Sequence, residues 1–277
     1  MNPGKITANL ARRIFLNEMH KYLFDQSSIY FKIAGENDKE MLLRFAENFD
    51  LNADLWIRFE KQRRRDIEMQ HRYEWHHFIP VNADNMIATS FMSMYLAHIL
   101  GHNKQNIIYV GEAGKLHDIG KGESPDSVLF KLGKLTPEER AWMRGHSRDG
   151  ARIVKKSRES LKKSKPILED CIEKHHVWID VDKGMESVVN SYPLTNPPGE
   201  FPRIIAATDA LTSMLYKRDY MRYDHYLHMK LDEQTIFDYA KKELLRESER
   251  SELNPHGIHF DRKIVELLLP IIEKMKS

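Results

Sequence analysis

Residues 107–121 of the chain read IIYVGEAGKLHDIGK, a pattern that predicts a helix from about Gln105 to Leu116. His117 and Asp118 close this helix directly after its apolar part. Both are residue types that bind metal ions, and they stand where inward-facing apolar side chains are expected. The stretch therefore indicates a helical protein with polar chemistry in its interior.

Helical patterns continue on both sides of this stretch after Pro80. Downstream, Thr136–Glu139 supplies an N-cap, a proline at N1 and a capping-box glutamate, which predicts one helix with His146 midway along it. Upstream, five residues share one helical face: Ile87, Phe91, Met94, Tyr95 and His98.

Four more helices are expected further along the chain. They begin near Pro166, follow Pro202, and cover about 233–247 and 261–274. The stretch between Val177 and Pro202 is rich in glycine and proline and is expected to be irregular. Residues 76–277 are therefore predicted to form an all-α bundle.

The first 75 residues are of a different type. Residues 28–33 (SIYFKI) form a β-prone run that a turn-like cluster follows, and residues 41–49 read as a helix. Residues 55–73 read as a long polar helix whose charge run, KQRRR at 61–65, we interpret as a solvated face. The predicted fold is mainly α, a helical bundle with a small N-terminal α/β domain at residues 1–75. We expect this domain, with its connecting helix, to regulate the bundle or to bind a protein partner.

Composition excludes several classes of protein. The 277 residues carry 43 Lys+Arg against 41 Asp+Glu, a net charge of +2, so no overall electrostatic footprint for nucleic acid is present. Cys171 is the single cysteine, which excludes a disulfide scaffold and a cysteine-rich zinc module. No run approaches the ~20 apolar residues that a membrane span needs, and the first residues lack the apolar core of a signal peptide. We therefore expect a cytoplasmic protein.

Metal-ligand residue types recur at four places where apolar side chains are expected. Asp209 interrupts the apolar run 204–211, and an unpaired carboxylate there would cost several kcal/mol, so it needs a cation. Each histidine alone could be a hydrogen-bonded core residue, but six candidates on four helices favour a dinuclear site. The six are His117, Asp118, His146, His175, His176 and Asp209.

The sequence resembles the HD-GYP family, a branch of the HD phosphohydrolases, over roughly residues 85–277. The resemblance starts with HDIGK at 117–121 and continues through an ordered series of further motifs. These are Pro125–Glu139, His146–Gly150, His175-His176 with Asp180, Arg203-Ile204 to Asp209, Arg218-Asp219-Tyr220 and His259-Phe260-Asp261.

The resemblance implies a metal-dependent phosphodiesterase that hydrolyses cyclic di-GMP to pGpG or GMP. It implies two or three divalent ions, iron or manganese, with the six residues above as ligands and Asp118 bridging two ions. Asp118 and Lys121 would be catalytic, and Lys121 and Arg218 would bind the substrate phosphates. A cyclic dinucleotide is then the expected small-molecule partner.

Two departures from the family pattern leave alternatives open. The family's D-G-x-G-Y-P loop is degenerate here, because Asp180 is followed by VDKGM. The nearest similar sequence, Ser-Tyr-Pro, lies further along the chain at residues 191–193. An upstream family histidine falls on Asn85 or Asp84; Asp84 could be a ligand, although we prefer to interpret it as an N-cap. The alternatives are a weak or inactive nucleotide-binding signalling module and an HD phosphohydrolase for another nucleotide.

Overall fold

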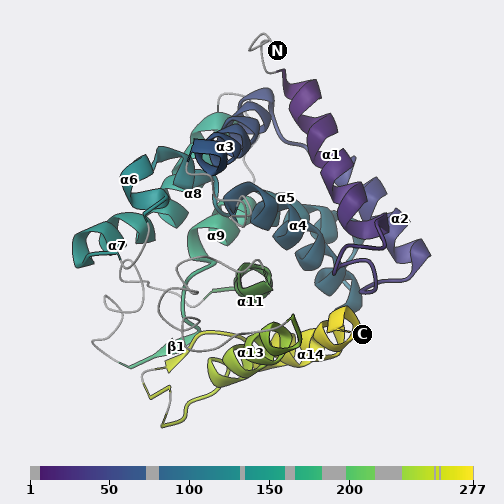
Figure 1. The fold of residues 1–277 in the computed structure, drawn as a ribbon, viewed down its shortest axis with the longest axis vertical. Helices are drawn as coiled ribbons and strands as arrows, with labels where there is room; N and C mark the ends of the chain where they lie inside the picture. The colour runs from purple at the N-terminus through teal and green to yellow at the C-terminus, as the bar shows by residue number, and fades with distance from the viewer. Residues whose placement is uncertain are drawn as a thin grey trace.

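The chain is helical in nearly all of the part that its computed structural model describes, which is residues 7–72, 81–131, 135–159, 166–182, 198–215, 233–252, 254–255 and 257–276 (Figure 1). Two short strands, β1 (Asp180–Val181) and β2 (Gly257–Ile258), pair antiparallel. None of the described helices is long and apolar enough to cross a membrane. The helices are α1 (Ala8–Phe24), α2 (Glu36–Ala46), α3 (Ala53–Arg72), α4 (Val81–Ile99), α5 (Lys104–Leu116), the 3-10 helix η1 (Ile119–Glu123), α6 (Asp126–Leu129), α7 (Pro137–Arg144), α8 (His146–Glu159), α9 (Pro166–Lys174), α11 (Glu200–Leu215), α13 (Glu233–Arg246) and α14 (Arg262–Lys276).

Local signals set several helix ends. The capping box predicted at Thr136 and Glu139 is confirmed, with both reciprocal hydrogen bonds present. The single helix predicted to continue through His146 is wrong, because α7 ends at Arg144 and α8 begins at His146. Gly145 separates the two helices, since glycine is a poor helix former. His146 therefore stands at the start of a helix, not midway along one.

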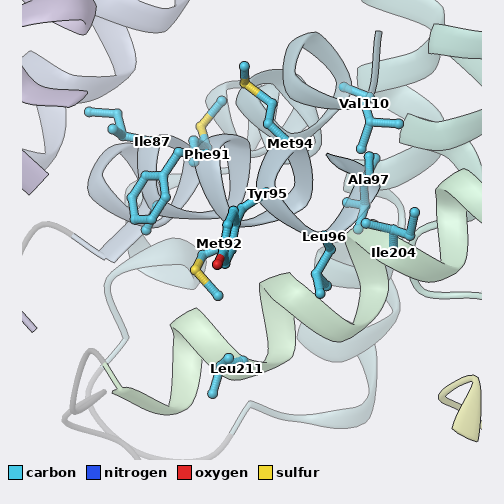
Figure 2. Close-up of a cluster of buried hydrophobic side chains, with 14 of the residues drawn as sticks. Ile87, Phe91, Met92, Met94, Tyr95, Leu96, Ala97, Val110, Ile204 and Leu211 are labelled. Carbon is cyan, nitrogen blue, oxygen red and sulfur yellow. The ribbon is translucent and has the colours of Figure 1, made fainter. Parts of the chain in front are cut away.

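Helix α4 is the centre of the hydrophobic core. Its side chains from Met86 to Ala97 are almost all buried, and it packs against α5 and α11. Figure 2 shows this cluster, with Met92 and Leu96 extending toward the α11 ribbon and Val110 contributed by α5. An apolar helix that is buried on most sides is typical of the centre of a bundle.

A seam of buried hydroxyl groups joins α4 to α11. Thr89 and Thr212 lie 3.0 Å apart by their Oγ1 atoms, and the Ser93 Oγ lies 2.7 Å from the Thr208 Oγ1. All four residues are fully buried. Because each hydroxyl has a partner, the seam is polar without leaving an unsatisfied group in the core.

The strand predicted at residues 28–33 is wrong, because these residues form turns between α1 and α2. The described residues 7–72 contain helices and turns only, so the α/β character expected there is wrong as well. Tyr30 from this run packs edge-on against Phe91 of α4, with ring centroids 4.9 Å apart. Tyr30 and Ile33 are buried among helices, whereas Ile29 is exposed, so the run has no neighbouring strand in the described part of the chain with which it could pair. The domain boundary at residue 75 stays a prediction.

Candidate metal centre

Six side chains come together where α5, α8, α9 and α11 pack against one another (Figure 1). Five of them are buried and one, His176, is half-buried. They are His117 and Asp118 at the junction of α5 and η1, His146 at the start of α8, His175 and His176 directly after α9, and Asp209 in α11.

The nitrogen and oxygen atoms of this cluster face one another at short distances. His117 Nε2 lies 3.3 Å from Asp118 Oδ2 and 3.3 Å from Asp209 Oδ1. His146 Nε2 lies 3.0 Å from Asp118 Oδ1 and 3.3 Å from His175 Nε2. Two groups of atoms within 4.8 Å of one another could each hold an ion. These groups are Asp118, His146, His175 and His176, and His117, His175 and Asp209.

Three of the histidines share one orientation that their local backbone sets. In each, Nδ1 lies within hydrogen-bond distance of the carbonyl oxygen three residues earlier: 2.7 Å for His117 and Gly114, and 2.7 Å for His175 and Ile172. His146 repeats the arrangement at 2.6 Å. A carbonyl can only accept, so Nδ1 carries a proton and Nε2 is the nitrogen that faces the cluster. Nε2 is therefore the atom with which each ring could bind a metal ion.

Burial and charge act on these groups in opposite directions. Burial alone would lower the pKa of His117, but the carboxylates of Asp118 and Asp209 outweigh it and raise the pKa to about 10. Burial, together with the neighbouring imidazoles, lowers the pKa of His175 to about 3. His175 is thus neutral at pH 7, as metal ligation requires. The carboxylates attract positive charge so strongly that His117 holds a proton when no ion is present.

The donor set fits a divalent metal ion. His117 Nε2 and Asp118 Oδ1 are buried and have no hydrogen bond of good geometry. Two such atoms beside a second carboxylate would be costly in the absence of a cation. Imidazole and carboxylate ligands together suit transition metals such as iron, manganese or zinc better than calcium. The residues thus fit a divalent metal, and their assignment as ligands stays a prediction.

Lys121 and a pocket complete the site. Lys121 Nζ lies 2.5 Å from Asp118 Oδ2. Burial would raise the pKa of Asp118, but this amine, followed by His117, holds it well below its ordinary value. A cavity of about 330 Å³ adjoins the cluster. Its lining includes Lys121, His146, His176 and Asp209, together with Tyr239 and Glu243 of α13 and Glu247 directly after it. Arg218, the other expected phosphate ligand, lies outside the described residues.

Asn85 is a buried neighbour of the cluster whose role the sequence did not predict. Its Nδ2 donates to Asp209 Oδ1 at 2.6 Å, and its Oδ1 accepts from Thr212 Oγ1 at 2.6 Å. Ser213 also donates to Asp209 Oδ1, at 3.1 Å. The signal in the sequence was an amide directly before the apolar residues Met86 and Ile87 of α4. Asp84 is the fourth residue of α4, which begins at Val81, so its interpretation as an N-cap is wrong.

We expect Asn85→Ala to weaken Mn²⁺ binding about tenfold, because hydrogen-bonding partners of a ligand typically contribute 10–100-fold to metal affinity. Without the amide, Asp209 loses its shortest hydrogen bond and keeps the longer contacts with Ser213 and His117, so its carboxylate is held less firmly. Calorimetric titration of the metal-free protein would measure the change. Asn48→Ala is the control, since Asn48 is exposed and bonds the Arg44 carbonyl. Equal Mn²⁺ affinity in the two variants would contradict the expectation.

The degenerate loop is described only in part. Asp180 lies in β1, and its carboxylate accepts from Arg250 Nε at 2.9 Å, so this contact ties β1 to the segment after α13. The similar Ser-Tyr-Pro sequence at residues 191–193 lies outside the described residues. His259 of the C-terminal motif contacts Glu247, with Nδ1 and Oε2 2.9 Å apart.

Comparison with known proteins gives matches of one kind. The HD domain family matches residues 82–214. A 3′3′-cGAMP-specific phosphodiesterase from Vibrio cholerae is 30% identical over 177 residues, which is 63% of this chain and 28% of the relative. A cyclic di-GMP phosphodiesterase from Thermotoga maritima is 31% identical over 137 residues, 47% of this chain and 33% of the relative. Among solved structures, Bd1817, an HDG"Y"P protein from Bdellovibrio bacteriovorus, covers 97% of this chain and 70% of its own at 12% identity, with a TM-score of 0.49.

The chain spans about a third or less of the length of the two curated relatives. Those enzymes therefore contain long segments to which nothing in this chain corresponds. The matched region runs from the first turn of α4 to the end of α11, which are the elements that bring the six side chains together.

Proposed function

The chain belongs to the HD-GYP family, and from this premise we propose that it is a metal-dependent phosphodiesterase that hydrolyses cyclic di-GMP to pGpG or GMP. The observation that carries the proposal is the cluster of four histidines and two aspartates beside a cavity that Lys121 also lines. Imidazoles, carboxylates and an amine around one cavity suit the binding and cleavage of a phosphodiester.

Each residue has a role that follows from its position. Two divalent ions, iron or manganese, would be held by His117, Asp118, His146, His175, His176 and Asp209. Asp118 belongs to the group with His146, and its other oxygen lies 3.3 Å from His117 of the second group. Such ions supply Lewis acidity and a nucleophilic water at neutral pH. Lys121 holds Asp118 in its charged form and presents an ammonium group to the cavity, where it can neutralise a phosphate oxygen.

The half-buried His176 marks where the substrate would enter. Five of the six side chains are buried, whereas His176 is partly open and lines the cavity together with Asp209 and Lys121. A phosphodiester bound there would meet the charged groups, and the rest of the nucleotide would extend toward α13. Arg218 is proposed to hold the second phosphate, because an arginine binds phosphate oxygens in pairs.

A second candidate substrate has support of its own. The relative from Vibrio cholerae is named for 3′3′-cGAMP, in which one of the two bases is adenine. The degenerate loop also leaves open a weak or inactive nucleotide-binding protein. Turnover distinguishes these candidates, whereas metal content does not, because an inactive receptor can retain its ions.

The test is incubation of the purified chain with cyclic di-GMP, 3′3′-cGAMP or cyclic di-AMP, in the presence of iron or manganese, under air and without oxygen. We expect linear pGpG or GMP from cyclic di-GMP at a higher rate than product from the other two, followed by chromatography. Faster cleavage of 3′3′-cGAMP would contradict cyclic di-GMP as the preferred substrate and favour 3′3′-cGAMP. No product from any of the three, with metal present in the protein, would overturn it in favour of a binding module.

A further inference from the structure

Helix α3 contacts the segment that follows His117 and Asp118. Arg65 donates to the carbonyl oxygens of Gly122 at 3.2 Å and Ser124 at 2.5 Å, and its Nε donates to Asp126 Oδ1 at 2.6 Å. One guanidinium thus holds three acceptors within five residues, and charge-assisted bonds of this kind are about twice as strong as neutral ones. The charge run at 61–65, expected to be a solvated face, is therefore partly a contact surface.

The same helix also reaches the backbone of the metal cluster itself. The Gln62 side chain is buried, and its Nε2 lies 3.4 Å from the carbonyl oxygen of Asp118. One turn earlier, the rings of Trp56 and Phe59 enclose Lys115 Nζ, at 4.2 and 3.6 Å from their centroids. Helix α3 thus contacts the chain on both sides of the His117–Asp118 pair.

On its other side, the segment is packed tightly against α8. A Cβ atom built on Gly120 would lie 2.0 Å from the carbonyl oxygen of His146 and 2.6 Å from the backbone nitrogen of Gly150. The 3-10 helix η1 is therefore held between α3 and α8, without space to shift toward α8. The hydrogen bonds with α3, in contrast, come from side chains that a substitution can remove.

We propose that Arg65 and Gln62 are positioning residues of the metal centre, through which α3 sets the orientation of Asp118 and Lys121. This rests on the proposed function in naming Asp118 a metal ligand. Within the segment, the Lys121 amide donates to the Asp118 carbonyl at 2.9 Å and the Ser124 amide to the Lys121 carbonyl at 3.0 Å. Arg65 of α3 bonds the Ser124 carbonyl at the end of this series of backbone hydrogen bonds. Removal of the Arg65 side chain would therefore let residues 118–124 shift together.

Arg64 provides a matched control on the same helix. Its Nε donates to Glu60 Oε1 at 3.0 Å, one turn back on α3, and Glu60 keeps Arg63 if Arg64 is removed. Arg64→Ala and Arg65→Ala therefore remove the same group, but only the second variant loses bonds to the segment after Asp118. Arg65→Lys keeps the charge and a single donor group in place of the fork.

The experiment measures Mn²⁺ affinity by calorimetry, without substrate, together with kcat and KM for the cyclic dinucleotide. We expect Arg65→Ala to lower both Mn²⁺ affinity and kcat about tenfold with KM changed less than twofold, in the range that partners of metal ligands show. Arg64→Ala should match the unmodified protein, and Arg65→Lys should lie between.

Unchanged Mn²⁺ affinity and kcat in Arg65→Ala would overturn the proposal, and so would equal losses in Arg64→Ala. If Arg65→Ala does not fold, Arg65→Lys decides, because wild-type affinity in that variant contradicts the proposal. If neither the unmodified protein nor any variant hydrolyses the substrate, the result counts against the proposed function. The positioning role of α3 is still tested in that case, because Mn²⁺ affinity is compared between the variants without substrate.

Discussion

Asp118→Ala should lower hydrolysis of the cyclic dinucleotide at least about a thousand-fold, a loss that exceeds that of a single transition-state hydrogen bond. The carboxylate lies 3.0 Å from His146, 3.3 Å from His117 and 2.5 Å from Lys121, so it joins the two groups of potential ligands. Its removal would also deprive Lys121 of its buried counter-charge. Metal content, measured by emission spectrometry, should fall in parallel.

Two variants make this prediction specific. Asp118→Asn keeps the shape of the side chain but not its charge, and it should lose most of the activity as well. Asp149→Ala removes an exposed carboxylate that pairs with Arg152 on the same helix, α8, and should leave turnover and metal content unchanged. Retention of turnover by Asp118→Ala would show that hydrolysis takes place elsewhere or by another means.

Gly120→Ala is expected to destabilise the protein by about 3 kcal/mol, at the upper end of what overpacking usually costs. The added Cβ would meet backbone atoms of His146 and Gly150, which cannot rotate away as a side chain does. For a chain of this size the melting temperature should fall by roughly 6–12 °C. Differential scanning calorimetry would measure the shift.

Gly122→Ala is the control for that prediction, because it changes the same short helix. A Cβ there would meet only Gln62 Oε1, at 3.6 Å, which is ordinary contact. We expect no destabilisation and at most about 1 kcal/mol of stabilisation, because alanine restricts the unfolded chain where it causes no clash in the folded one. Similar melting temperatures for both variants would mean that η1 and α8 can move apart.

The helices of the bundle were largely predictable because their apolar faces repeat at helical spacing. The failures have local causes. Residues 28–33 have β-prone side chains, but β-propensity depends on available neighbours, and here the neighbours are helices that bury Tyr30. The break before His146 had a signal in Gly145, which the capping box upstream did not reveal. Periodicity indicates that a helix exists more reliably than where it ends.

The candidate site was predictable at the level of residue type and order, and the structure brings all six named side chains together. The neighbouring residues that hydrogen-bond to these side chains or to their backbone were not predictable. Asn85 reaches Asp209 over 124 positions in sequence, and Gln62 reaches Asp118 over 56. Such contacts depend on how helices pack, which a pattern along one chain does not contain. A lysine or arginine run likewise does not show whether it contacts solvent or backbone, as Arg65 illustrates.

The hydroxyl seam between α4 and α11 limits how these two helices can diverge in sequence. Each Ser or Thr contacts a group on the opposite helix, and Thr212 contacts two, because its hydroxyl lies 3.0 Å from Thr89 Oγ1 and donates to Asn85 Oδ1 at 2.6 Å. Replacement of Thr212 by an apolar residue would therefore leave the buried oxygen of Asn85 without this donor, whatever residue stands at position 89. The seam thereby couples core packing to the metal centre, because Thr212 bonds Asn85 and Asn85 donates to the carboxylate of Asp209.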